Sequence, residues 1–121
     1  MHSDELLELA QTSLEDSKAR DVRLLDVRDM TSVTDYLLVA SGTSDRHVSS
    51  ISVRLIEAAK KAGQAPIGIE GQEAGEWVLI DLADVVVHVM QPRAREFYKL
   101  EDLWSVGSLG SEDVVDSSGT S

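Results

Sequence analysis

The feature that most constrains this chain is an apolar run followed at once by a turn and a polar helix start, in residues 34–44. Residues 36–40, Tyr-Leu-Leu-Val-Ala, are continuously apolar, which is typical of a strand that is covered on both faces. Residues 41–42, Ser-Gly, interrupt this run. Thr43 or Ser44 can then cap a helix, because a hydroxyl oxygen accepts a backbone N–H of the first turn. The stretch therefore predicts a central strand, a tight turn and a helix in direct succession.

Apolar residues at spacings of three and four predict two longer helices. The first is expected over residues 3–19, where Ser3 can act as the N-cap and acidic residues occupy the positive first turn. The second is expected over residues 44–62, and Gly63 follows at the position where a left-handed residue closes a helix. The buried stripe of this second helix is expected to consist of Val48, Ile51, Leu55, Ala58 and Ala62.

Apolar runs between turn residues predict four further strands, at residues 22–27, 65–70, 77–82 and 85–90. The adjacent Leu24 and Leu25 indicate a first strand that is partly covered on both faces. Pro66 restricts its strand to a sheet edge or a strand start, because proline cannot donate to a ladder. A short helix at residues 93–98 and a last helical turn at residues 100–104 follow. This order predicts an α/β (α+β) domain with a mixed sheet flanked by helices.

Composition separates a domain from a tail near residue 104. The chain has 121 residues, of which 42% are hydrophobic, and this fits one globular domain. From Ser105 onward Gly, Ser, Asp and Glu prevail, and such a segment buries too little surface to offset the entropy of ordering it. We therefore predict a domain over residues 1–104 and a disordered acidic tail over residues 105–121.

The formal net charge of −11, from 22 acidic and 11 basic residues, restricts the partners of the chain. Nucleic-acid binding depends on Lys and Arg that neutralise phosphates, so direct sequence-specific binding of nucleic acid is not expected. An acidic surface favours basic partners and speeds the encounter with them. The alternative, that the charge only keeps the protein in solution, stays open.

Signals for disulfides and membranes are missing from the sequence. The chain has no cysteine, which excludes disulfides and thiolate zinc sites. No apolar run reaches the roughly 18 residues of a membrane span. The acidic N-terminus does not fit a signal peptide. These features predict a cytoplasmic protein without a membrane partner.

Patterns for catalysis or metal binding are incomplete. A hydrolase uses residues of the types found at Asp35, Ser41, Ser44 and His88, but the Gly-x-Ser-x-Gly elbow is missing. The histidines at positions 2, 47 and 88 lack the spacing of metal ligands. The glycines between residues 63 and 75 lack the Gly-Lys-Ser/Thr of a phosphate loop. We therefore expect no catalytic, cofactor-binding or metal-binding residues.

The hairpin of the last two strands carries the candidate partner-binding face. If Leu82 and Ala83 form a two-residue loop, alternation places three cross-strand pairs on one face: Asp81 with Asp84, Leu79 with Val86, and Trp77 with His88, with Met90 beyond. Two interpretations stay open. Either the chain itself covers Trp77, or this face binds a partner, because aromatic anchors with a polar rim are typical of interfaces. The candidate partner-binding residues are Trp77, Leu79, Asp81, Asp84, His88, Met90 and Tyr98.

Six segments form a specific set when they are taken together. They are Thr-Asp-Tyr at 34–36, Ala-Ser-Gly-Thr-Ser-Asp-Arg at 40–46, Glu-Gly at 70–71, Gly-Glu-Trp-Val-Leu-Ile-Asp-Leu at 75–82, Asp-Val-Val-Val-His-Val at 84–89 and Arg-Glu-Phe-Tyr-Lys-Leu-Glu-Asp-Leu-Trp at 95–104. In this order and spacing, over residues 3–104, the chain resembles the Iojap family of ribosomal silencing factors (RsfS).

The resemblance implies a mixed five-stranded sheet flanked by helices, similar to the nucleotidyltransferase fold but without its catalytic residues. It implies binding to the large ribosomal subunit through ribosomal protein number fourteen (the uL-fourteen protein). Bound there, family members block joining of the small subunit and repress translation when nutrients are limited. Members of the family often form homodimers.

Two other functions stay open beside the one that the resemblance implies. The first is a degenerate nucleotidyltransferase-like enzyme or nucleotide-binding protein. Only part of that fold's Gly-Ser turn remains at Gly42-Thr43, and Asp81 and Asp84, three apart around a turn, are poorly spaced for one metal cluster. The second is a homodimeric scaffold without a ribosomal role.

Overall fold

A computed structural model describes residues 1–98 of the chain. The expected helical turn at residues 100–104, the domain end at residue 104 and the expected tail at residues 105–121 lie outside the described residues. The described elements, in chain order, are α1 (Ser3–Asp16), β1 (Arg20–Asp26), β2 (Tyr36–Ser41), α2 (Asp45–Lys61), β3 (Gly68–Glu70), β4 (Trp77–Asp81), β5 (Val85–Met90) and α3 (Pro92–Tyr98).

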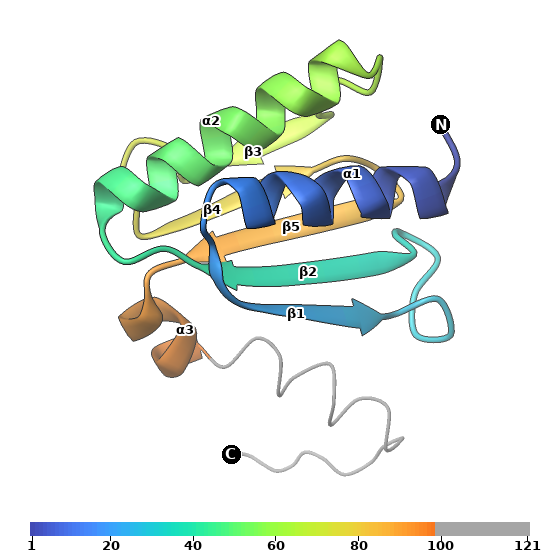
Figure 1. Ribbon diagram of the computed structural model, residues 1–121. Coiled ribbons are helices and arrows are strands. Elements are labelled where there is room, and N and C mark those ends of the chain that lie inside the picture. The colour runs from blue at the N-terminus through green and yellow to red at the C-terminus, as the bar shows by residue number, and fades with distance from the viewer. Residues whose placement is uncertain (99–121) are drawn as a thin grey trace, which may run out of the picture.

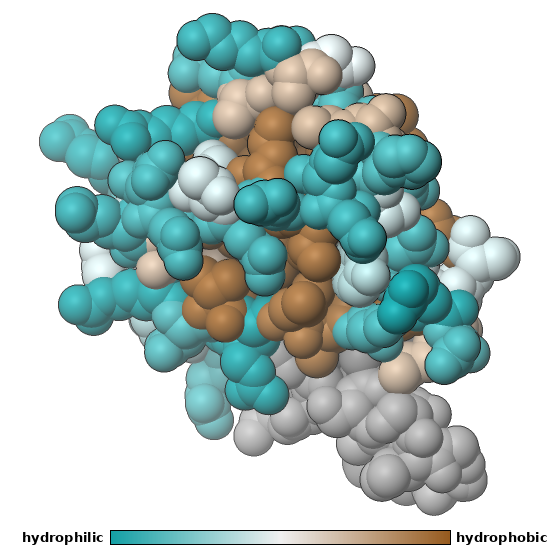
Figure 2. All heavy atoms as spheres, turned by 45° about the vertical axis from the view of Figure 1, so that its right-hand side comes forward, coloured by the Kyte–Doolittle hydropathy of each residue, from teal (hydrophilic) through white to brown (hydrophobic). Residues whose placement is uncertain are grey.

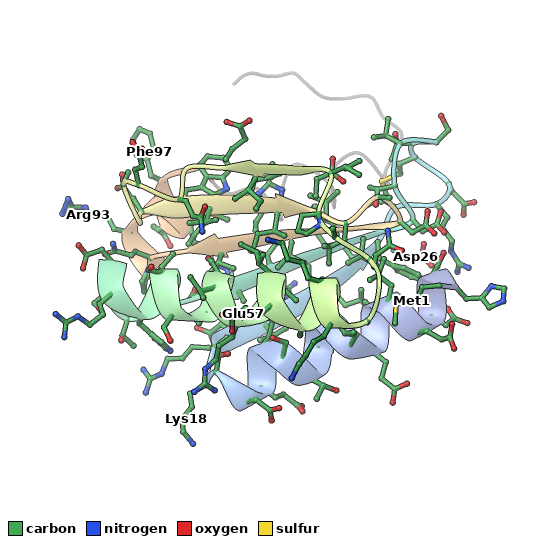
Figure 3. All side chains as sticks on the ribbon, turned by 90° about the horizontal axis from the view of Figure 1, so that it is seen from above. Met1, Lys18, Asp26, Glu57, Arg93 and Phe97 are labelled. Atoms are coloured by element: carbon green, nitrogen blue, oxygen red, sulfur yellow. The ribbon has the colours of Figure 1, made fainter. Side chains whose placement is uncertain are left out.

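The strands form one five-stranded sheet in the order β1-β2-β5-β4-β3. β2 and β5 run parallel, whereas the other neighbouring pairs are antiparallel. α1 and α2 cover one face of the sheet, and α3 lies on the other side (Figure 1). Seen from above, α1 and α2 lie side by side (Figure 3). The predicted α/β domain with a mixed sheet flanked by helices is confirmed.

The strand, turn and helix start predicted in residues 34–44 form as expected. Every residue of β2 is buried, as its apolar run predicts for a strand covered on both faces. The turn brings strand and helix so close that a Cβ on Gly42 would lie 2.7 Å from Val48 Cγ2. Ser44 caps α2, because its Oγ accepts the backbone N–H of His47 at 3.1 Å. Gly63 follows the helix with a φ of +85°, as predicted.

Two apolar clusters hold the layers together. The larger lies between the sheet and the helices α1 and α2, and its fully buried side chains include Leu6, Leu14, Leu38, Leu55 and Ile80. The smaller lies on the opposite face, where α3 contributes Ala94 to a cluster with Val27, Leu37, Val39 and Met90. Part of the second face is therefore closed by α3.

α1 differs from its prediction at both ends. His2 is the N-cap and Ser3 is the first helical residue, so the predicted cap at Ser3 was wrong. The Ser3 hydroxyl donates instead to Asp35 Oδ2 at 2.6 Å, a contact that joins distant parts of the chain. The helix ends at Asp16 rather than near residue 19, because Lys18 adopts a left-handed φ of 62°.

β1 is an exposed edge strand, which corrects the expectation of partial cover on both faces. All of its residues except Leu25 are exposed, and 43% of Leu24 is accessible to solvent. β1 ends the sheet order, so only β2 flanks it. The adjacent leucines therefore did not distinguish an edge strand from a central one.

The buried stripe of α2 departs from its prediction toward the C-terminal end. Val48, Ile51 and Leu55 are buried as expected, but further along the helix Ile56 and Ala59 are buried, whereas Ala58 is half-buried and Ala62 is exposed. The distance from Val48 to Ala59 is close to three whole turns at 3.6 residues per turn, so Ala59 returns to the same face. Ala62 is the C-cap, beyond the last packed turn.

The remaining boundaries differ from the predictions by up to three residues. β3 contains only Gly68–Glu70 and lies at the sheet edge, as Pro66 indicated. β4 ends at Asp81, and α3 already begins at Pro92, where a missing N–H costs no helical hydrogen bond.

The exposed surface of the described residues is largely hydrophilic on the side seen in Figure 2. Apolar side chains gather there in a narrow band between hydrophilic ones. Large exposed apolar side chains of residues 1–98 include Val33, at 79% exposure, and Ile67, at 70%.

Candidate functional site

The hairpin of β4 and β5 has a register two residues away from the predicted one. Asp81 pairs with Val86, Leu79 with His88, and Trp77 with Met90. The turn therefore centres on Ala83 and Asp84 rather than on Leu82 and Ala83, with Leu82 N–H donating to Val85 O at 2.9 Å.

The turn is stabilised by an acidic side chain of β4. Ala83 has a φ of 78°, which is unfavourable for alanine, and its N–H donates to Asp81 Oδ1 at 2.9 Å. This local contact helps to hold an alanine where a glycine or asparagine is the usual choice, and it explains why residue types alone predicted the wrong register.

The predicted face survives this correction. A shift of two residues leaves every side chain on its original side of a strand. Trp77, Leu79, Asp81, Val86, His88 and Met90 therefore still share one face, whereas Val78, Ile80, Val87 and Val89 lie in the cluster beneath α1 and α2. The shared face is the one that α3 partly covers.

Burial divides this face into an accessible part and a supporting part. Trp77, Leu79 and Asp81 are half-buried. His88 is only 7% exposed, and Met90 is fully buried in the cluster with Ala94. The expectation of an exposed Met90 was wrong, because α3 folds back over this part of β5. Trp77 lies between the two interpretations, since it packs against this cluster and still reaches the surface.

Asp84 does not lie at the rim of this face. Its Oδ2 is 3.2 Å from the Ser3 hydroxyl of α1, which covers the opposite face of the sheet. The expected position of Asp84 opposite Asp81, on the face that Trp77 shares, was therefore wrong, because the turn residue points toward the helix layer. Tyr98 ends α3, and its side chain lies outside the described part of the chain.

A hydrogen bond links the two rings of the face. Trp77 Nε1–H donates to His88 Nδ1 at 2.8 Å, and the ring centroids are 5.8 Å apart at an interplanar angle of 48°. Burial lowers the pKa of His88 to about 4, since an imidazolium would lose its hydration there. His88 is thus neutral at pH 7, which leaves Nδ1 free to accept.

The sequence predicted Tyr98 of α3 as a site residue but not the bonds that attach this helix to the sheet. Arg95 Nη1 donates to Ser41 Oγ at 2.9 Å, and Gln91 Nε2 donates to Gly75 O at 3.1 Å. These bonds attach α3 and the segment before it to the ends of β2 and β4. A helix of seven residues is too short for a periodic pattern to show which side faces the sheet.

The imidazole of His47 makes two contacts within the fold. Its Nδ1 accepts the backbone N–H of Thr43 at 2.9 Å, and its Nε2 lies 2.9 Å from Ser17 O. His47 therefore joins the start of α2 to the end of α1. Residues 1–98 contain no group of three or more His, Cys, Asp and Glu side chains that could hold a metal ion.

Comparison with known proteins places the chain in a family. Residues 1–120 match the family model RsfS, described as ribosomal silencing factor during starvation. The chain belongs to the RsfS family. The resemblance seen in the sequence motifs is thereby confirmed. The RsfS and Iojap proteins are translation regulators associated with the ribosome.

Relatives and a solved structure agree with this membership. A Chromobacterium violaceum protein named ribosomal silencing factor RsfS is 43% identical over 104 residues, which are 86% of this chain and 85% of that protein. A crystal structure of a protein from the same organism, also 43% identical, matches with a TM-score of 0.85 over 87% of this chain and 88% of that chain. A mouse protein named mitochondrial assembly of ribosomal large subunit protein 1 is 33% identical over 109 residues, covering 88% of this chain and 48% of that protein.

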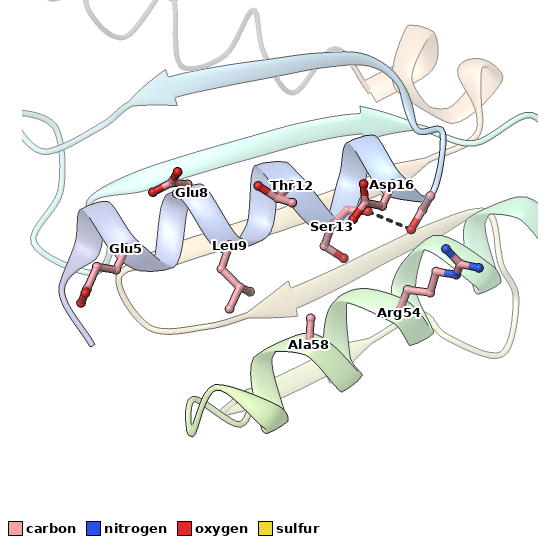
Figure 4. A pocket seen from close by; sticks show the side chains of 9 residues that line it. Glu5, Glu8, Leu9, Thr12, Ser13, Asp16, Arg54 and Ala58 are labelled. Carbon is pink, nitrogen blue, oxygen red and sulfur yellow. Dashed lines mark hydrogen bonds between the residues drawn. The ribbon is translucent and has the colours of Figure 1, made fainter.

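This RsfS-family chain also has a groove on the helix layer, away from Trp77. It lies between α1 and α2, has a volume of about 520 Å³, and includes Leu9, Ala58, Arg54 and three carboxylates among its lining residues (Figure 4). Glu5, Glu8 and Asp16 supply these carboxylates. The groove provides a matched acidic surface. Mutations there can be compared with mutations on the Trp77 face, which consists of Trp77, Leu79, Asp81, Val86, His88 and Met90. No helix within residues 1–98 is both long and apolar enough to cross a membrane.

Proposed function

We propose that this chain binds the large ribosomal subunit through ribosomal protein number fourteen (the uL-fourteen protein) and sterically blocks joining of the small subunit. Bound in this way, it represses translation when nutrients are limited. The observation that carries the proposal is the match of residues 1–120 to the family of ribosomal silencing factors. The name of the mouse relative, which refers to the large ribosomal subunit, supports the choice of subunit.

The charge of the chain supports a protein partner on the ribosome rather than RNA. A net charge of −11 favours a basic ribosomal protein and disfavours the phosphates around it. Attraction to the basic protein and repulsion by the RNA phosphates together restrict where the chain docks.

We place the contact on the accessible part of the Trp77 face. Trp77 and Leu79 offer apolar surface there, and Asp81 adds a carboxylate beside them. A half-buried aromatic anchor with a charged neighbour is the arrangement that binding hot spots favour. His88 and Met90 support this surface from below, and Tyr98 at the end of α3 remains in the proposed contact.

Co-sedimentation with purified ribosomal subunits tests the proposal. The chain should sediment with large subunits and not with small ones, and isolated ribosomal protein number fourteen should compete for it. Large subunits loaded with the chain should join small subunits less efficiently in a density gradient. A chain that stays in the supernatant with both subunits would contradict the proposal.

The proposal treats the chain as a binding protein without turnover, acting in the cytoplasm where its ribosomes are. Titration with nucleotides and Mg²⁺ separates it from the nucleotidyltransferase-like alternative, which saturable, metal-dependent binding would favour. Homodimerisation of the free chain belongs to the same proposal. Light scattering should give the mass of a dimer, and a monomer mass at every concentration would contradict this part.

A further inference from the structure

We propose that His88 is a positioning residue, whose imidazole fixes the Trp77 indole so that a partner meets the carbon ring and not the indole N–H. This inference rests on the proposed function of the Trp77 face. It assigns to His88 a role that does not require contact with the partner.

The position of the two residues in the sheet makes their hydrogen bond directional. Trp77 lies opposite Met90, and His88 lies opposite Leu79, so the two rings are diagonal neighbours on adjacent strands. Diagonal neighbours are farther apart than directly opposed residues, and only side chains that lean toward each other meet. The 2.8 Å bond between Trp77 Nε1 and His88 Nδ1 thus selects one orientation of each ring.

The burial of the two residues differs in the way that this role requires. His88 is 7% exposed and therefore presents almost no surface to a partner, whereas Trp77 is half-buried. Because Nδ1 accepts the bond, the ring proton of neutral His88 is on Nε2. The histidine is held on a strand in the interior of the sheet, and the tryptophan that it orients reaches the surface.

The occupied indole N–H defines the chemistry that the partner needs. A donor that is already bonded within the chain does not call for an acceptor from outside. The remaining indole surface is aromatic carbon, and Asp81 lies four residues further along β4 on the same face, beyond Leu79. The side chain that fits the ring is Lys or Arg, because its aliphatic stem packs on the ring while its charge is attracted to the ring face. The carboxylate of Asp81 further along the face favours the same positive charge in the partner.

The experiment uses the full chain with Trp104→Phe, so that Trp77 is the only remaining tryptophan of the two in the sequence. His88→Phe keeps a ring of similar size and removes the acceptor. His88→Asn is the matched control, because its amide oxygen can occupy the position of Nδ1. NMR measures the solvent exchange of the Trp77 indole N–H, and co-sedimentation measures the affinity for purified large subunits.

We expect His88→Phe to accelerate indole exchange and to weaken subunit binding by about tenfold, the equivalent of one hydrogen bond of typical net strength. His88→Asn should restore both the slow exchange and the binding. In a Trp77→Phe background, His88→Phe should cause no further loss of affinity, because a residue that acts through Trp77 has nothing left to position.

Three results would overturn the inference: unchanged indole exchange in His88→Phe, unchanged subunit binding despite faster exchange, or an equal loss of affinity with and without Trp77. Failure of the proposed function looks different. In that case the parent chain does not bind large subunits at all, while the exchange rate still decides whether His88 holds the indole.

Discussion

At the scale of single residues, the neutral state of His88 links the stability of the domain to pH. Burial holds the pKa of His88 at about 4 in the folded chain, whereas a histidine in the unfolded chain titrates near 6.5. Between these values the unfolded chain binds a proton that the folded chain does not. The free energy of unfolding therefore decreases as the pH falls through this window.

We expect His88→Phe to flatten this pH dependence. The parent chain should lose about 3 kcal/mol between pH 6.5 and pH 4 through His88, an order-of-magnitude figure from the difference in pKa. Denaturant unfolding of both proteins across this range measures the effect. Carboxylates titrate in both, so the difference between the two curves isolates the histidine. Parallel curves would show that folding does not lower the pKa of His88.

Trp77 contributes to both folding and binding, because it packs against the Met90 cluster and reaches the surface. Trp77→Ala should destabilise the domain by about 2 kcal/mol, below the roughly 3–5 kcal/mol of a fully buried aromatic. Binding to large subunits should weaken by about 2–4 kcal/mol, the range of interface hot spots. Melting curves and co-sedimentation of the same variant separate the two losses.

Ile67→Ala is the control for this prediction. Ile67 is 70% exposed and precedes β3, so its loss removes apolar surface without opening a core cavity. Neither melting nor binding should change much. If Trp77→Ala lowered binding only in proportion to the unfolded fraction, Trp77 would belong to the core alone.

At the scale of elements, the passage from β2 to α2 depends on the missing side chain of Gly42. A Cβ there would lie 2.9 Å from the backbone N of Val48, as well as 2.7 Å from its Cγ2. Backbone cannot move away as easily as the end of a side chain. β2 and α2 therefore meet at a position where any Cβ forces the strand or the helix to shift.

Gly42→Ala should destabilise the domain by about 1–3 kcal/mol, the usual cost of overpacking. Gly68→Ala is the matched control, because the nearest atom to its new Cβ is Asp81 Cβ at 3.9 Å, an ordinary contact distance. Thermal unfolding compares the two. Equal melting temperatures for both variants would mean that α2 shifts to admit the methyl group without loss.

At the scale of the whole molecule, the acidic charge and the two faces of the sheet act together. The helix layer carries acidic residues at the groove between α1 and α2, and the opposite face carries Asp81 on the same strand as Trp77. A net charge of −11 attracts a basic partner to either side, but only the docking side retains it.

Asp81→Asn and Glu8→Gln each remove one negative charge and lie on opposite sides of the sheet, so they separate the local effect of charge from the overall one. Asp81→Asn keeps an oxygen that can accept the Ala83 N–H. Asp81→Asn should slow association with large subunits more than Glu8→Gln does. The difference should shrink as salt shortens the screening length below about 8 Å. Stopped-flow or surface binding kinetics measure both rates. Equal rates for the two variants at low salt would place the contact elsewhere.

The sequence by itself determined the elements and the layers of this protein. The uninterrupted apolar run of β2 and the period of α2 are local patterns, and the burial of β2 and of Val48, Ile51 and Leu55 agrees with them. The sequence also placed Trp77 and His88 on the face opposite Val78 and Val87, since alternation along a strand is a property of the backbone.

Only the tertiary structure decided the details of the candidate site. The hairpin register depends on the bond from Ala83 N–H to Asp81, and the direction of Asp84 depends on Ser3 of α1. The burial of Met90 depends on α3, which Arg95 attaches to β2. The register arises from one local contact between a side chain and the turn. The direction of Asp84 and the burial of Met90 arise from contacts between residues that are distant in the chain. Such contacts leave no periodic trace in the sequence, because each involves one side chain rather than a repeating face.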